Sequence, residues 1–345
     1  MNIPLTTAEV PPQFLKSAFL IGQIPQRALA SDPRISYALY VPPTHYNPNP
    51  NQTPPTTTNN NNNNNNNSNS NNSNSNNNNN KPLLPLLIHI HGSSRNITPI
   101  RQSLVPFADT TPCAILSPLF PANLDHPNDL DSYTHLRSPT LRSDLALLSI
   151  LDEVAHVWPG IDTREVFMMG FSGGGQFVHR FLYLYPERLS AVSVGAPGKV
   201  TVLDGGRDWP VGIRDVKGLF GREVEREKVA GVGIQMVVGG EDVKVHGGEE
   251  FWVWVRGLLK ERGVKMGKVG EGKGEETGGG KEGEAGKGIK VMSQGRMESL
   301  RMLQRNWEED GIQVRFDVVN GVGHYSPGVE DCVLGFLRPL MKRRE

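Results

Sequence analysis

The chain has 345 residues, and its 36 lysines and arginines balance 36 aspartates and glutamates. A chain without excess charge has no overall field that would attract nucleic acid or an acidic membrane surface, so we expect neither as a partner. The two cysteines, Cys113 and Cys332, are too few for a disulfide framework, which indicates free thiols in a reducing compartment.

No apolar run reaches the length of a membrane span. Residues 1–26 lack the basic start and sustained apolar stretch of a signal peptide. We therefore expect a cytoplasmic protein, although the sequence says nothing about its oligomeric state.

Two kinds of periodicity alternate along the chain. Residues 34–41 place Ile35, Tyr37, Leu39 and Val41 on one face, as in a strand. Further strands are predicted at residues 83–92, 113–120, 166–169, 189–195, from 232 to about 239, and 311–321. Helical stripes are formed by Leu141, Leu145, Leu148, Leu151 and Ala155, by Phe177, Val178, Phe181, Leu182 and Tyr185, and by Met297, Leu300, Leu303 and Trp307. Strands that alternate with helices predict an α/β fold with a mainly parallel sheet covered on both faces.

Two low-complexity segments interrupt this pattern. Residues 47–80 are rich in Pro and Thr and then almost entirely Asn and Ser, and residues 263–288 are mainly Gly, Lys and Glu. Neither segment has apolar side chains to bury, so we expect both to be disordered insertions. The rest of residues 1–345 is predicted to form a single domain.

The stretch Gly170-Phe171-Ser172-Gly173-Gly174 lies where an apolar strand gives way to a helical pattern. Small residues two positions either side of the serine allow the sharp strand-to-helix turn of the G-x-S-x-G motif. Such a turn exposes the serine hydroxyl at a helix N-terminus, where free amides stabilise a developing anion. A phosphate-binding loop is the alternative, but no lysine stands between Gly170 and Gln176.

Chemically active residues follow several of the predicted strands. Ser172 follows one of them, Glu241 and Asp242 follow residues 235–238, and His324 follows the last strand. The carboxyl ends of parallel strands share one edge of a sheet, so these residues are expected to meet. Their chain order, serine, acid and then histidine, separates this arrangement from other Ser-His-Asp folds.

The sequence resembles the α/β-hydrolase superfamily, and within it esterases of the poly(3-hydroxybutyrate) depolymerase and feruloyl esterase type. The resemblance is carried by YALYVP, IHIHGSS, GFSGGGQF, YPERLSAVSVGAPG, VVGGEDV and GVGHYS, which span residues 35–343 apart from the two insertions. It departs from many lipases in having His-Gly-Ser-Ser where they have a His-Gly-Gly-Gly run. The resemblance implies the α/β-hydrolase fold and hydrolysis of a small-molecule ester.

The residues divide the chemistry between them. Ser172 is expected to attack an acyl carbonyl, and His324 to take its proton. The amide of Gly173 is one expected oxyanion donor, and the resemblance places the second on the loop after Gly92, at Ser93. It also selects Asp242 as the acid that orients His324, whereas the residues alone leave Glu241 open as a rival.

Other titratable residues are given structural interpretations. Asp317 is a weak third acid because it lies inside the last predicted strand. His89 and His91 are expected to pack and shape their loop, His156 and His179 to be solvated or packed in helices, and His246 to lie too close to Asp242 to serve as base. No cluster has metal-ligand spacing, so we predict neither a metal nor a cofactor.

Two questions stay open at this point. The aromatic stretch at residues 249–260 forms either a cap over an acyl pocket or, as we favour, a helix that packs on the sheet. The leading function is a carboxylic ester hydrolase. The alternatives are a serine peptidase or amidase, and a non-catalytic binding protein on a hydrolase frame.

Overall fold

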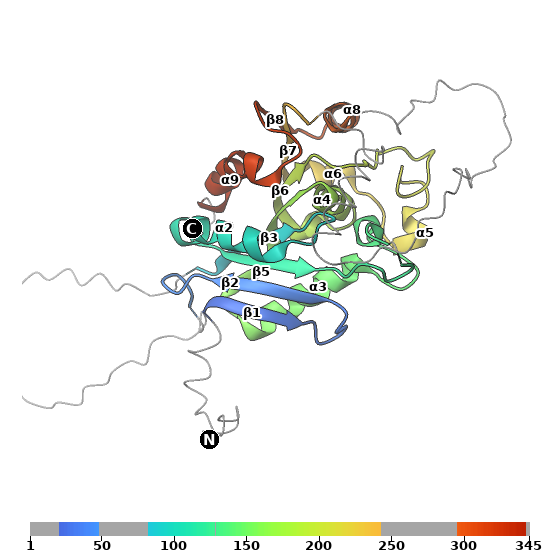
Figure 1. Ribbon diagram of the computed structural model, residues 1–345. Coiled ribbons are helices and arrows are strands. Elements are labelled where there is room, and N and C mark those ends of the chain that lie inside the picture. Colours follow the sequence, from blue (N-terminus) through green and yellow to red (C-terminus); the bar gives the residue numbers. More distant parts are fainter. Residues whose placement is uncertain (1–20, 48–81, 128, 243–294, 343–345) are drawn as a thin grey trace, which may run out of the picture.

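The computed structural model describes residues 21–47, 82–127, 129–242 and 295–342 (Figure 1). Its strands form one 8-stranded sheet in the order β1-β2-β4-β3-β5-β6-β7-β8. They are β1 (Gly22–Ala28), β2 (Ser36–Val41), β3 (Leu84–Ile90), β4 (Ala114–Leu119), β5 (Ile161–Phe171), β6 (Leu189–Gly195), β7 (Gly233–Gly239) and β8 (Arg315–Val319). Strand β2 is antiparallel to β1 and β4, and all other neighbours are parallel. The carboxyl ends of β3 to β8 therefore share one edge.

Helices cover both faces of this sheet. The longer ones are α2 (Ile97–Thr110), α3 (Ser143–Val157), α4 (Gly173–Leu184), α8 (Arg296–Glu309) and α9 (Ser326–Lys342). Short ones are α5 (Val216–Phe220), α6 (Arg226–Ala230) and the 3-10 turns η1 (Ser132–His135) and η2 (Pro186–Arg188). Helices α3, α4 and α8 share one core with Ile88 and Met168, whereas α2 and α9 share another with Leu87 and Phe167. Because successive strand residues point to opposite faces, one buried strand supplies both cores. The predicted parallel sheet with helices on both faces is confirmed.

Helix α3 packs only part of its predicted stripe on the core: Leu141 and Leu151 are buried and Leu148 contacts the core, but the other two members do not. Leu145 is 44% exposed, and Ala155 is also exposed. Besides Leu151, the buried apolar side chains of the helix are Ala146, Leu147, Ile150 and Val154. Leu141 precedes the helix, which begins at Ser143, and the predicted Leu145 and Leu148 lie one position past the buried Asp144 and Leu147. Buried Asp144, which accepts a hydrogen bond from Tyr185 Oη at 2.8 Å, also fixes which face points inward.

The sequence pattern gave no prediction for β1, α2 or α9. Strand β1 lies at an edge and buries only Ile24, so it has no alternation to detect. Helices α2 and α9 each contain a proline, Pro106 and Pro339, which normally argues against a helix interior. Packing on the sheet overrides that local preference.

The amino end of β5 anchors the chain on both sides of residues 48–81. The amide of Leu84 donates to the carbonyl of Gly160 at 2.8 Å, and a Cβ on Gly160 would lie 2.0 Å from the carbonyl oxygen of Asn47. Ser172 follows the opposite end of β5. The paired stretch of β3, from Leu84 to Ile90, spans about 20 Å at the usual rise per residue, and β5 covers the same length with a bulge between Asp162 and Phe167. Apart from Asn47, the predicted insertion at 47–80 lies outside the described residues, as does the one at 263–288.

In the part of the chain that the structure describes, no helix is both long and apolar enough to cross a membrane.

We predict that deletion of residues 52–80 leaves the fold intact. The two flanking segments already meet at Gly160, and the entropy of loop closure changes slowly with length, so unfolding free energy should change by about 1 kcal/mol at most. Chemical denaturation of the shortened and full-length proteins measures this difference. A loss of several kcal/mol would show that the deleted segment contributes packing of its own.

Candidate active site

Ser172 occupies a strained turn between β5 and α4. Its φ is 58° and its ψ is −116°, a conformation that L-residues rarely adopt. The turn is held by two backbone bonds, from the Ser172 amide to the Gly195 carbonyl at 2.9 Å and from the Gln176 amide to the Ser172 carbonyl at 3.1 Å. Ser172 is half-buried, so its hydroxyl sits at the N-terminus of α4 within reach of a ligand.

Glycines around Ser172 let three strand ends touch through their backbones. A Cβ on Gly170 would lie 2.5 Å from the carbonyl group of Gly174, and one on Gly174 would lie 2.2 Å from the carbonyl oxygen of Ile90. Gly175, which the motif does not include, is equally constrained, because its Cβ would lie 2.4 Å from the Gly195 carbonyl oxygen. Steric exclusion of a Cβ therefore requires glycine at positions 170, 174 and 175.

The amides of Gly173 and Ser93 lie close together beside this turn. A Cβ built on Gly173 would be 3.2 Å from both the backbone nitrogen and Oγ of Ser93. One on Gly92 would be 3.8 Å from Cβ of Ser172. The loop after β3 therefore approaches the strained serine closely, and its amide is near the first amide of α4.

His91 orients the peptide that contains the Ser93 amide. Its Nε2 accepts a hydrogen bond from the Phe120 amide at 3.1 Å, so the proton must be on Nδ1, which donates to the Gly92 carbonyl at 2.8 Å. The carbonyl and the N–H of a trans peptide point in opposite directions. Because the Gly92 carbonyl faces the His91 ring, the Ser93 N–H points away from it. Burial, with the positive charge of Arg95, lowers the pKa of His91 to about 3, so this neutral arrangement persists at any ordinary pH.

The segment between β4 and α3 supports the same loop. Asp131 accepts a hydrogen bond from Ser93 Oγ at 3.1 Å, and the buried hydroxyl of Tyr133 donates to the His91 carbonyl at 2.9 Å. Arg95 donates from its backbone to Gly92 and from its side chain to the carbonyls of Ser93 and Leu130. Most polar groups of the loop are thereby fixed before any ligand arrives.

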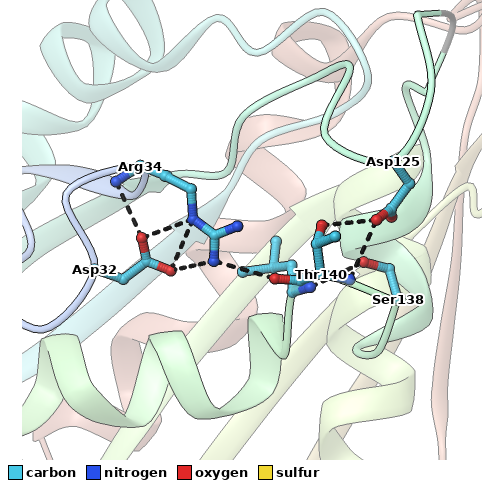
Figure 2. Close-up of polar contacts among 6 residues, drawn as sticks. Asp32, Arg34, Asp125, Ser138 and Thr140 are labelled. Carbon is cyan, nitrogen blue, oxygen red and sulfur yellow. Dashed lines mark hydrogen bonds and ion pairs between the residues drawn. The ribbon is translucent and has the colours of Figure 1, made fainter.

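A second polar network ties the β4–α3 segment to the β1–β2 turn, as Figure 2 shows. Arg34 pairs with Asp32 and donates to the Thr140 carbonyl at 3.1 Å. The hydroxyl of Thr140 donates to Asp125 at 2.7 Å, and bonds to Thr140 and Ser138 hold the pKa of Asp125 below its ordinary value. Both ends of the segment that carries Asp131 and Tyr133 are therefore anchored.

The acid and the histidine meet at the ends of β7 and β8. Oδ2 of Asp242 lies 2.6 Å from Nδ1 of His324, and the Asp242 side chain has no exposed surface. The other oxygen, Oδ1, accepts a hydrogen bond from Nη1 of Arg296 at 2.9 Å. The ring of Phe171, next to Ser172 in the chain, has its centroid 4.9 Å from that of His324. The pair thus lies against the serine turn.

Backbone contact also brings the two loops of this pair together. A Cβ on Gly239 would lie 2.2 Å from the carbonyl oxygen of Val322. The Glu241 amide donates to the same carbonyl at 2.9 Å, and the Gly240 amide donates to that of Val319 at 2.8 Å. These bonds turn Asp242 inward, whereas Glu241 is exposed to solvent.

The remaining sequence candidates lie elsewhere. Asp317 pairs with Arg315 at 2.8 Å and accepts from Gln235 at 2.7 Å. His179 is buried and bonds to Gly175 and Thr201, and His156 is exposed on α3. Burial lowers the pKa of His89 to about 4. His246 and the aromatic stretch at 249–260 lie outside the described residues.

Among residues 21–47, 82–127, 129–242 and 295–342, no three His, Cys, Asp or Glu side chains gather as metal ligands would. The expectation of a metal-free site stays a prediction.

No protein-family model and no curated protein matches this chain. Among solved structures it is similar to poly(aspartic acid) hydrolase-1 from Sphingomonas sp. KT-1, with a TM-score of 0.54 and 16% identity over 87% of this chain and 92% of that one. It is also similar to LpqC, a poly(3-hydroxybutyrate) depolymerase from Bordetella parapertussis, with a TM-score of 0.53 and 16% identity over 90% of this chain and 88% of that one. The fold is the α/β-hydrolase fold.

Sequence reasoning missed several residues that shape this α/β-hydrolase site. Asp131 and Tyr133 lie at the short 3-10 turn η1, which carries no sequence motif, and Arg296 reaches Asp242 across 54 positions of chain. Gly175 was the one detectable omission, because it stands in the same glycine run as the motif.

We predict that Ser172→Gly makes the protein more stable than Ser172→Ala. Glycine adopts the observed φ and ψ without strain, and relief of about 1–3 kcal/mol should exceed its extra chain entropy of about 0.5–1 kcal/mol. Denaturant unfolding of both variants measures the difference. Ser299→Gly, in the interior of α8, is the matched control and should destabilise instead. A Ser172→Gly variant that is less stable than Ser172→Ala by the chain entropy alone, about 0.5–1 kcal/mol, would mean that the turn carries no strain.

Proposed function

We propose that this protein is a serine hydrolase of carboxylic esters. The contact that carries the proposal is the 2.6 Å pair of Asp242 and His324 beside the strained turn of Ser172. Serine, aspartate and histidine on strand-end loops, in that chain order, are the components of a catalytic triad in this fold. The names of the similar structures, one a poly(aspartic acid) hydrolase and one a poly(3-hydroxybutyrate) depolymerase, support a hydrolase.

In the proposed reaction, Oγ of Ser172 attacks the ester carbonyl carbon while Nε2 of His324 takes the hydroxyl proton. Nδ1–H of His324 donates to Asp242 throughout, which fixes the tautomer that leaves Nε2 free as an acceptor. The tetrahedral oxyanion accepts from the amides of Gly173 and Ser93. The imidazolium then protonates the leaving alcohol, and an acyl-enzyme on Ser172 forms.

Water then hydrolyses the acyl-enzyme by the same kind of step, with water as the nucleophile and Oγ of Ser172 as the leaving group. His324 takes a proton from the water as its oxygen attacks the acyl carbon, and then returns that proton to Oγ of Ser172 as the carboxylic acid leaves. The oxyanion loop needs no rearrangement between the two halves, because His91, Tyr133 and Asp131 already hold it in place. Preorganised donors of this kind account for a large share of the rate in acyl transfer.

We predict that a fluorophosphonate probe labels the protein at Ser172 and that Ser172→Ala abolishes labelling. The same variant should lower kcat by about 10⁴–10⁶, since it removes the nucleophile. Kinetics on p-nitrophenyl esters, hydroxycinnamate esters and aminoacyl amides would locate the substrate class. Folded protein that neither labels nor turns over any ester would indicate a non-catalytic frame, and faster amide than ester cleavage would indicate a peptidase or amidase.

We predict that Asp242→Asn lowers kcat by nearly 10⁴, because an amide favours the wrong tautomer of His324. Glu241→Gln is the matched control on the adjacent, exposed side chain and should cost less than about tenfold. Both kcat values are to be compared at matched thermal stability. The reverse ranking would assign the acid to Glu241.

A further inference from the structure

A buried arginine shares the candidate acid with the histidine. Arg296, the first residue of α8, is 2% exposed, and its Nη1 lies 2.9 Å from Oδ1 of Asp242. The second carboxylate oxygen, Oδ2, lies 2.6 Å from Nδ1 of His324, whose side chain is 13% exposed. The carboxylate of Asp242 therefore bridges a permanent cation and an imidazole that is neutral or charged according to pH.

Burial makes the choice of counter-charge important. The Asp242 side chain has no exposed surface, so an ionised carboxylate there must be compensated by a neighbouring cation rather than by water. If His324 were its only charged partner, the carboxylate would favour the imidazolium more strongly, and the imidazole would lose its proton only at higher pH. A protonated imidazole has no lone pair with which to accept the proton of Ser172.

We propose that Arg296 is a positioning residue that supplies a permanent counter-charge to Asp242 and so keeps His324 neutral, and able to act as a base, down to lower pH. The inference rests on the proposed function for the role of His324, but the charge arrangement itself does not depend on turnover. The bond of Arg296 to Oδ1 also fixes the carboxylate so that Oδ2 faces the imidazole.

Other charged side chains on the elements around Asp242 are bonded elsewhere or face solvent. They are Glu241 on the same turn, Arg315 and Asp317 on β8, Glu298, Arg301 and Arg305 on α8, and Glu330 and Asp331 on α9.

Several of these side chains have partners other than Asp242. Arg315 pairs with Asp317, Arg305 with Glu298, and Arg301 lies over the ring of Phe316 at 4.1 Å. Glu330 accepts from Ser103 at 3.1 Å, and Glu241 and Asp331 are exposed. In the described part of the chain, the structure thus shows two side chains paired with Asp242, namely Arg296 and His324.

The direct test is an NMR titration of the His324 imidazole in the Ser172→Ala protein, which needs no turnover. Arg296→Met should raise the midpoint by about one pH unit or more, because the imidazolium becomes the only counter-charge of Asp242. Arg296→Lys should leave the midpoint nearer the parent value, since it keeps a cation. Arg305→Met, the same change on the exposed side of α8, should leave it unmoved. The lost signal in His324→Gln assigns the resonance.

Kinetics give a second readout with the intact Ser172. In Arg296→Met the acidic limb of kcat/KM should move to higher pH by the same amount, because His324 must be neutral to act. The loss should therefore be greatest near pH 6 and recover toward pH 9. If Arg296→Met does not fold, Arg296→Gln, which keeps a donor but no charge, is expected to shift both readouts in the same direction.

A midpoint that stays unchanged or falls in the neutral variants overturns the inference. So does an equal loss of kcat/KM at every pH, which would mean that Arg296 only supports the fold. A raised midpoint in a protein that hydrolyses no ester would retain the charge arrangement and reject the proposed function.

Discussion

The site depends on close backbone contact between the ends of neighbouring strands. Gly174 approaches the carbonyl of Ile90, Gly175 that of Gly195, and Gly239 that of Val322, each at a distance where a Cβ would collide. Strands in a sheet lie about 4.8 Å apart, so the turns that follow them have room for backbone but not for side chains. Glycine at these positions allows the serine turn, the loop after β3 and the loop after β7 to share one small region.

That constraint has a cost, which falls on Ser172. A turn closed by Gly170 and Gly174 leaves the serine at a φ of 58°, a strained conformation for a residue with a side chain. The strain persists because the bonds to Gly195 and Gln176 and the packing of α4 on the sheet overdetermine the turn. Strain of this kind is common where a side chain must project from the edge of a sheet.

Two polar systems flank the serine turn, and they differ in charge. On the side of the loop after β3, the His91 ring is neutral and bonded through both nitrogens, so it orients the Ser93 amide without adding a net charge. On the other side, the buried carboxylate of Asp242 lies between Arg296 and His324, so this system carries charge. The first arrangement fixes geometry, whereas the second fixes where a proton can reside.

The sequence by itself determined the alternation of strands and helices, the turn at Ser172, and the order of serine, acid and histidine. These features are encoded locally, in side-chain periodicity and in glycine spacing. Only the tertiary structure decided that Asp242 rather than Glu241 contacts His324, because bonds from Gly240 and Glu241 to another loop set which side chain turns inward. It alone revealed Arg296, Asp131 and Tyr133, and the buried face of α3. Such contacts join segments far apart in the chain, and the local periodicity of a sequence does not predict which distant residue a side chain will contact.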